Sequence, residues 1–137
     1  MTHWLFPDLL NDSAIFVEAQ RYWATLWAEV QSTIQAEASW STPWMQNPCL
    51  DGNPIFTAVC RSLRRGVRII HEGPPDAAEP DLDWWLDYFG DKKDPDAIHE
   101  LVIACCPSTE NTPRIKQLLK QWIKFGKLTL RRPKAAS

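Results

Sequence analysis

The stretch from Ile98 to Gly126, IHELVIACCPSTENTPRIKQLLKQWIKFG, decides the fold because it joins the clearest strand signal of the chain to its clearest helix signal. Residues 98–106 predict a strand that is apolar on both sides, which is typical of a central strand covered on both faces. Thr112 can cap a following helix, Pro113 fits its first turn, and Gly126 fits the left-handed position after its last turn. The stretch therefore predicts a β-strand followed by an amphipathic helix.

The residues around this stretch predict further helices and strands. A long helix is expected over 13–38, which has no Gly or Pro and repeats apolar residues at three- and four-residue steps. A shorter helix is expected over 53–66, a strand over 67–72 and a short edge strand over 127–131. Residues 80–89 fit a helix because their apolar side chains fall at helical spacing. These side chains are Leu82, Trp85, Leu86 and Phe89.

The alternation of helices and strands predicts an α/β fold. We expect a small parallel or mixed sheet of two to four strands with helices packed on it, the long N-terminal helix included. The 137 residues suit a single domain over 1–137. Its expected parts are an N-terminal arm (1–12), the long helix, a connector (39–53), an α-β-α-β-α-(β) unit over 53–130 and a basic tail (131–137).

Composition indicates a globular cytoplasmic protein. Hydrophobic residues make up 45% of the chain and charged residues 23%, which is too apolar for a disordered chain. The four cysteines are too few and too irregularly spaced for a disulfide scaffold, so we expect free thiols in a reducing compartment. No segment resembles a signal peptide or a membrane span.

Charge is distributed unevenly along the chain. Ten acids lie between residues 72 and 100, against two lysines, whereas the chain after Glu110 has eight bases and no acid. The two regions either face each other or stay solvated, or they dock onto an oppositely charged partner.

An acidic and aromatic segment together with a basic helix stripe forms the candidate contact surface. On a helix over 80–89, Trp84 and Tyr88 would lie beside Asp83 and Asp87, next to a buried stripe that includes Trp85. Aromatic side chains supply contact area and acids supply orientation at protein interfaces. The C-terminal helix would add a stripe of three lysines on its polar side: Lys116, Lys120 and Lys124.

Two other functional classes have weaker support. Arg61, Arg64, Arg65 and Arg68, with the C-terminal lysines, would suit a nucleic-acid-binding accessory protein, although the chain is acidic overall. Cys105 and Cys106 lie at a predicted strand end before a helix N-terminus, where a small cysteine-dependent enzyme could place its nucleophile.

The details of that strand end argue against catalysis. The loop after Cys106 contains no glycine and carries Glu110, which would repel an anionic substrate. His71–Glu72 and His99–Glu100 show no metal-ligand spacing. We therefore assign no catalytic residue, cofactor or metal from the sequence. We predict a non-enzymatic protein-interaction module of regulatory, adaptor or immunity type, and a homodimer through the long N-terminal helix is a further possibility.

Overall fold

The computed structural model describes residues 12–33, 40–41, 43–46, 54–72 and 82–129. The predicted N-terminal arm before residue 12, the end of the long helix after residue 33 and the basic tail lie outside the described residues.

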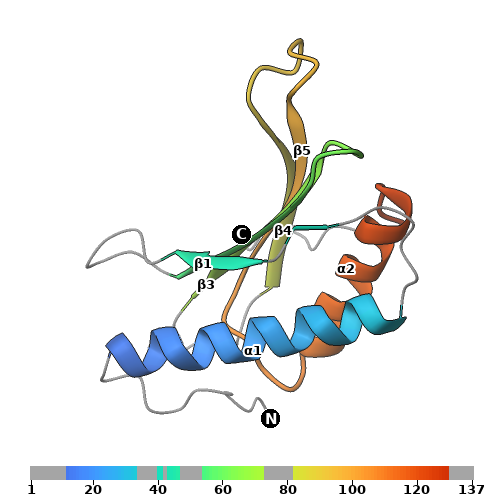
Figure 1. The fold of residues 1–137 in the computed structure, drawn as a ribbon. Helices are drawn as coiled ribbons and strands as arrows, with labels where there is room; N and C mark the ends of the chain where they lie inside the picture. Colours follow the sequence, from blue (N-terminus) through green and yellow to red (C-terminus); the bar gives the residue numbers. More distant parts are fainter. Residues whose placement is uncertain (1–11, 34–39, 42, 47–53, 73–81, 130–137) are drawn as a thin grey trace, which may run out of the picture.

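In the described part of the chain, a five-stranded mixed sheet and two helices form an α/β fold (Figure 1). The order of strands in the sheet is β1-β2-β3-β5-β4. Strands β3 and β5 are parallel, and every other neighbouring pair is antiparallel. The predicted α/β class is confirmed, but the sheet has five strands where two to four were predicted. The elements are α1 (Asp12–Thr33), β1 (Trp44–Gln46), β2 (Ile55–Cys60), β3 (Arg65–His71), β4 (Leu82–Phe89), β5 (Ile98–Cys105) and α2 (Thr112–Phe125).

Strand β5 occupies the inner position that its sequence predicts. It lies between β3 and β4, and Leu101, Val102 and Ile103 are all buried. Val102 is 2% exposed although it points away from the helices, because its cross-strand neighbours are Arg68 and Trp85. Large side chains on both neighbouring strands therefore cover β5 on its second face.

The helix predicted over 53–66 is wrong, because residues 55–66 form β2, a turn and the start of β3. Within β2, buried and half-buried side chains alternate, with Phe56, Ala58 and Cys60 buried. Gly66, the predicted helix end, lies inside β3, where an added Cβ would meet the Ile98 side chain at 3.2 Å. The segment IFTAVC is rich in β-branched and aromatic residues, and pairing with β3 gives it the partner that a strand requires.

The helix predicted over 80–89 is also wrong, because Leu82–Phe89 form strand β4 at the edge of the sheet. All eight residues of β4 pair with β5, from Leu82 opposite Cys105 to Phe89 opposite Ile98. A run of Trp, Tyr and Phe has high β-propensity, and the inner strand β5 stabilises it as a strand.

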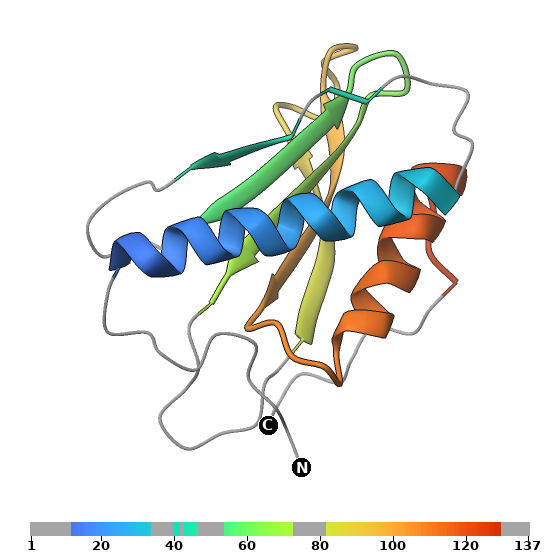
Figure 2. The same cartoon turned by 60° about the horizontal axis from the view of Figure 1, so that its bottom comes forward.

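Both helices pack on the same face of the sheet (Figure 2). Helix α1 buries Ala19, Trp23, Leu26, Trp27 and Val30 in the main core cluster. A dimer seam on α1 would have to use other side chains, such as Val17, which is 50% exposed. The homodimer itself stays a prediction.

Helix α2 confirms the predicted bounds, and of the apolar face expected from the sequence Ile115, Leu118 and Trp122 are fully buried, whereas Phe125 is 57% exposed. Gly126 ends it in the left-handed conformation, with φ 68°. The predicted cap differs, because the Thr112 hydroxyl donates to the Ser108 carbonyl and Asn111 occupies the cap position. Residues 127–129 of the predicted edge strand are not in a strand.

Candidate functional site

The four predicted contact residues of segment 80–89 lie on two different faces of β4. Residues alternate along a strand, so Trp84 and Tyr88 point to the helix side while Asp83 and Asp87 point to the opposite side. Trp84 is 6% exposed and belongs to the main core cluster, so its predicted role as a partner-facing side chain is wrong. Trp85, predicted to be in the core, is half-buried on the other face.

Asp83 and Asp87 bind the backbone of their own strand. The Asp83 carboxylate accepts a hydrogen bond from the Trp84 amide at 2.9 Å, and the Asp87 carboxylate accepts one from the Tyr88 amide at 2.8 Å. β4 is an edge strand, and free amides at an edge invite pairing with another chain. The two aspartates therefore have a local role in shielding this edge.

The predicted lysine stripe is partly used within the chain. Lys116 forms an ion pair with Glu29 of α1 at 2.6 Å, which ties the two helices together. Lys124 lies over the ring of Phe125, and Lys120 is half-buried. A docking role for this stripe stays a prediction.

The four arginines between residues 61 and 68 do not form one continuous basic strip. Arg65 reaches the Trp122 and Ile123 carbonyls at the end of α2, on the helix side. Arg68 forms an ion pair with Glu100 at 2.8 Å on the opposite face. The nucleic-acid alternative, which depends on these bases acting together, stays a prediction.

Cys105 and Cys106 do not have the environment of reactive thiols. Both are buried free cysteines, and burial raises the pKa of each thiol, that of Cys106 to about 12. A nucleophilic cysteine needs its pKa lowered by nearby positive charge or by a helix N-terminus, whereas every contribution to these two thiols raises the pKa. This environment weighs against the cysteine-enzyme alternative.

His71 lies in the core at the end of β3 and joins the sheet to α1. Its Nδ1 accepts a hydrogen bond from Trp23 Nε1 at 3.0 Å, and the imidazole is 1% exposed. Burial lowers its pKa to about 4, so the ring is neutral at pH 7. Among the described residues, no group of three or more His, Cys, Asp and Glu side chains is arranged to hold a metal ion.

The sheet face opposite the helices, which we call the open face, carries a candidate contact surface. One row of cross-strand neighbours crosses all five strands on this face, with a tryptophan at each end and a charged residue at its centre. The row runs Trp44, Thr57, Arg68, Val102 and Trp85.

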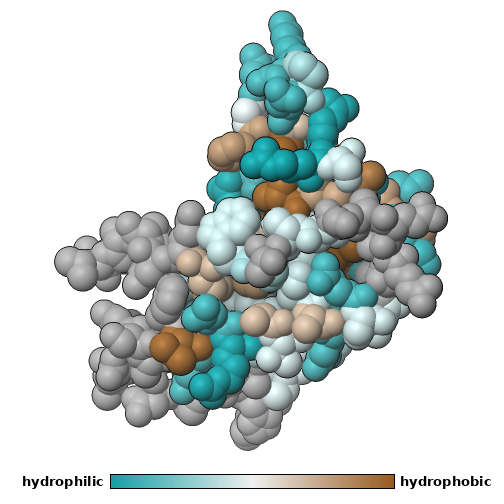
Figure 3. Space-filling view, in the orientation of Figure 1, coloured by the Kyte–Doolittle hydropathy of each residue, from teal (hydrophilic) through white to brown (hydrophobic). Residues whose placement is uncertain are grey.

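A cleft of about 490 Å³ lies on the open face beside this row. Its apolar lining includes Trp44, 43% exposed, and Phe89, 63% exposed. Figure 3 shows apolar side chains gathered below the hydrophilic tip of the molecule. The cleft is lined by Trp44, Ile55, Thr57, Val59, Arg61, Arg68, Phe89, Ile98 and Glu100.

Arg68 and Glu100 form the polar centre of the cleft. The Glu100 residue is 5% exposed, and burial raises its pKa while Arg68 opposes that rise. Gly66 leaves space for the Glu100 side chain, since a Cβ added at Gly66 would lie 3.3 Å from it. The carboxylate is therefore satisfied inside the chain, which leaves Arg61 as the exposed charge of the lining.

Sequence reasoning missed this face because it placed Trp44 in a connector and placed segments 53–66 and 80–89 in helices. The richness of IFTAVC in β-branched and aromatic residues was a strand signal, whereas LDWWLDYF has no strict alternation of apolar and polar residues.

No helix in the described part of the chain is long and apolar enough to cross a membrane. Comparisons of the chain with protein-family models, with curated proteins and with solved structures find no match in any of the three.

Proposed function

We propose that this chain is a non-enzymatic binding module that contacts another protein through the open face of its sheet, in a regulatory, adaptor or immunity-type role. The observation that carries the proposal is the cleft with Trp44 and Phe89 exposed in its lining. Large aromatic side chains dominate the binding energy of protein interfaces, and they are costly to leave in water without such a role.

The chemistry of the lining indicates what the partner presents. An apolar side chain would fill the cleft between Trp44 and Phe89. Arg61 lies exposed in the same lining and forms no salt bridge with a described carboxylate. An acidic side chain next to the apolar anchor would therefore complement it. A cytoplasmic setting suits the three described cysteines, which are buried free thiols.

Two phenylalanine substitutions give a matched test of this surface. Phe89 on the open face is 63% exposed, and Phe125 at the end of α2 is 57% exposed. Wild type, Phe89→Ser and Phe125→Ser are used to capture partners from the source cell, and the affinity for the recovered protein is then measured by titration. We expect Phe89→Ser to weaken binding about 30-fold, the effect of a hot-spot residue, and Phe125→Ser to leave it unchanged.

Hydrogen exchange of the complex locates the contact independently. Binding should slow exchange in β1, β2 and the end of β4, with α1 unaffected. Equal loss of binding in the two phenylalanine variants, or protection confined to the helices, would refute an open-face interface. Self-association through Phe89 would identify a second copy of this chain as the occupant and would overturn the proposal of a different protein.

A further inference from the structure

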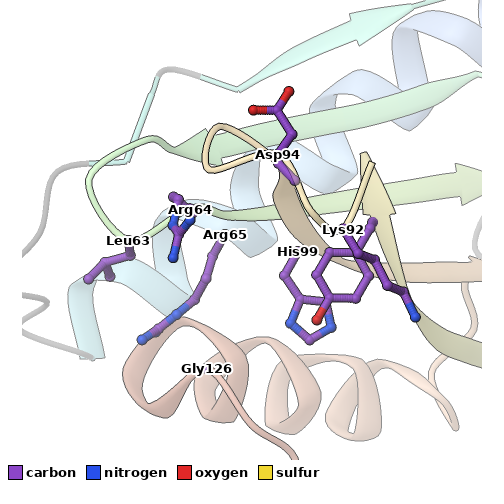
Figure 4. Close-up of a pocket in the computed structure, with 9 residues that line it drawn as sticks. Leu63, Arg64, Arg65, Lys92, Asp94, His99 and Gly126 are labelled. Atoms are coloured by element: carbon purple, nitrogen blue, oxygen red, sulfur yellow. The ribbon is translucent and has the colours of Figure 1, made fainter. Parts of the chain in front are cut away.

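A second cavity lies on the helix side of the sheet, where several parts of the chain meet (Figure 4). The turn between β2 and β3 supplies Arg64, the start of β3 supplies Arg65, and the connection from β4 to β5 supplies Lys92. His99 on β5 and Gly126 after α2 complete this side of the lining. The cavity has a volume of about 330 Å³ and shares no lining residue with the cleft on the open face.

Positive charge dominates this cavity. Arg64, Arg65 and Lys92 line it together with one carboxylate, that of Asp94. None of the three cations forms a salt bridge with a carboxylate in the described part of the chain. Figure 4 shows the Asp94 carboxylate turned away from Arg65 and His99. The cavity thus holds three cations against a single carboxylate, and no salt bridge within the described residues neutralises them.

The backbone holds the two arginines in place. Arg64 has the left-handed φ of 54°, which is uncommon outside glycine, and its Nη1 donates to the Pro95 carbonyl at 2.6 Å. Arg65 Nη1 points to two carbonyls at the end of α2, each 3.4 Å away. A guanidinium has five N–H donors, so each arginine keeps donors for a ligand after these contacts.

The opposite wall is an ordered aromatic stack. The rings of Tyr88 and His99 are parallel, with centroids 4.4 Å apart, and His99 meets the Trp122 ring edge-on. Lys92 Nζ lies 5.0 Å from the centre of the Tyr88 ring. The stack thus positions a cation and provides a flat surface beside the arginines.

We propose that this cavity binds the phosphoryl group of a small phosphorylated molecule. Three cations against one carboxylate match a dianion, and guanidinium groups bind phosphate through paired hydrogen bonds. A planar monocarboxylate would be satisfied by one arginine and would leave the other cations unpaired. The volume is at the lower end for ligand pockets, so the phosphoryl group fits with a small adjoining part of the molecule.

Titration with inorganic phosphate and with O-phosphoserine tests the proposal. Binding is followed by calorimetry and by the NMR signals of the His99 ring, at constant ionic strength. We expect saturable binding with one site per chain. Arg64→Gln should weaken it about tenfold by removing a charged donor, and Asp94→Asn should tighten it by removing a repelling charge.

Arg61→Gln is the matched control, because Arg61 belongs to the same turn, is exposed and lines the other cleft. It should change the affinity less than about twofold. Lys92→Gln is a second variant that touches none of the backbone contacts of the turn, and it should also weaken binding. Absence of saturable binding by the wild type, or equal weakening by Arg61→Gln and Arg64→Gln, would overturn the proposal. Neither result bears on the open face.

Discussion

Trp84 and Trp85 are adjacent in the sequence but have opposite environments. The Trp84 ring lies in the core between the sheet and the helices, whereas Trp85 is half-buried on the open face beside Val102. Trp84 Nε1 is buried without a hydrogen-bond partner among the described residues. Its contribution to stability therefore comes from apolar contact, which must outweigh the cost of a desolvated N–H group.

This difference predicts opposite consequences of two alanine substitutions. Trp84→Ala should lower the free energy of unfolding by about 3–5 kcal/mol, because it leaves a large cavity in the core. Trp85→Ala should lower the free energy of unfolding by a clearly smaller amount, because the Trp85 ring is already partly exposed to water. Trp84→Phe keeps an aromatic ring, removes the unpaired N–H and should be far milder than Trp84→Ala. Urea unfolding followed by circular dichroism measures all three.

The order of stability of Trp84→Ala and Trp85→Ala tests the strand assignment. A Trp85→Ala variant that is less stable than Trp84→Ala would contradict the strand register of β4 and favour the helical alternative for segment 80–89.

At the level of elements, β4 is an unusual edge strand because two of its own side chains bond backbone amides of the same strand. Asp83 and Asp87 each accept a hydrogen bond from the amide of the following residue, so a strand that approached this edge would find these amides already bonded. The opposite edge strand, β1, is only three residues long, which offers little backbone for pairing. The two edges of the sheet are thus protected in different ways.

Removing both aspartates should open the β4 edge. We expect Asp83→Val with Asp87→Val to form dimers or larger species by edge pairing, because it frees two amides and adds β-branched side chains. Light scattering after size-exclusion chromatography measures the species. Asp96→Val with Glu110→Val is the control, because it removes two exposed acids that lie outside β4. Association of both double variants to the same extent would show that net charge, not the edge, is responsible.

At the level of the whole molecule, helix–sheet packing depends on a buried pair that responds to acid. Trp23 on α1 donates to His71 on β3, and only a neutral imidazole can accept this bond. The folded state lowers the His71 pKa from 6.5 to about 4, so the unfolded chain takes up the proton more readily. Stability from His71 is therefore complete above about pH 6.5 and is lost as the pH falls toward 4.

The expected size of this loss is about 3 kcal/mol. His71→Gln keeps an acceptor for Trp23 but does not titrate, so the stability difference between wild type and variant should shrink across this pH range. Urea unfolding at several pH values measures it. Burial raises the pKa of Glu100, so this residue favours the folded state as the pH falls, opposite to His71. Glu100 is present in both proteins, and its contribution cancels in the stability difference between them. If the free energies of unfolding of wild type and His71→Gln changed in parallel with pH, the proposed contribution of His71 to the pH dependence would be disproved.

The sequence by itself determined the elements whose signals are local. The apolar run of β5 predicts its inner position, and the helix α2 is delimited by Pro113 and Gly126, with its buried face readable from a 3.6-residue period. The α/β class, predicted from the alternation of helices and strands, holds although residues 55–60 and 82–89 are strands and not helices. Each of these elements carries its signal within a short stretch of sequence, although the backbone of β5 is satisfied by β3 and β4.

Only the tertiary structure decided the state of residues 55–60 and 82–89, and with it the candidate sites. Both segments carry apolar residues at spacings that suit a helix and a strand alike. A strand is stable only when a distant segment satisfies its backbone, and β3 and β5 do so here. That pairing buries Trp84, exposes Phe89 and brings Arg64 to Lys92. Local periodicity cannot determine these positions because they depend on which strands pair.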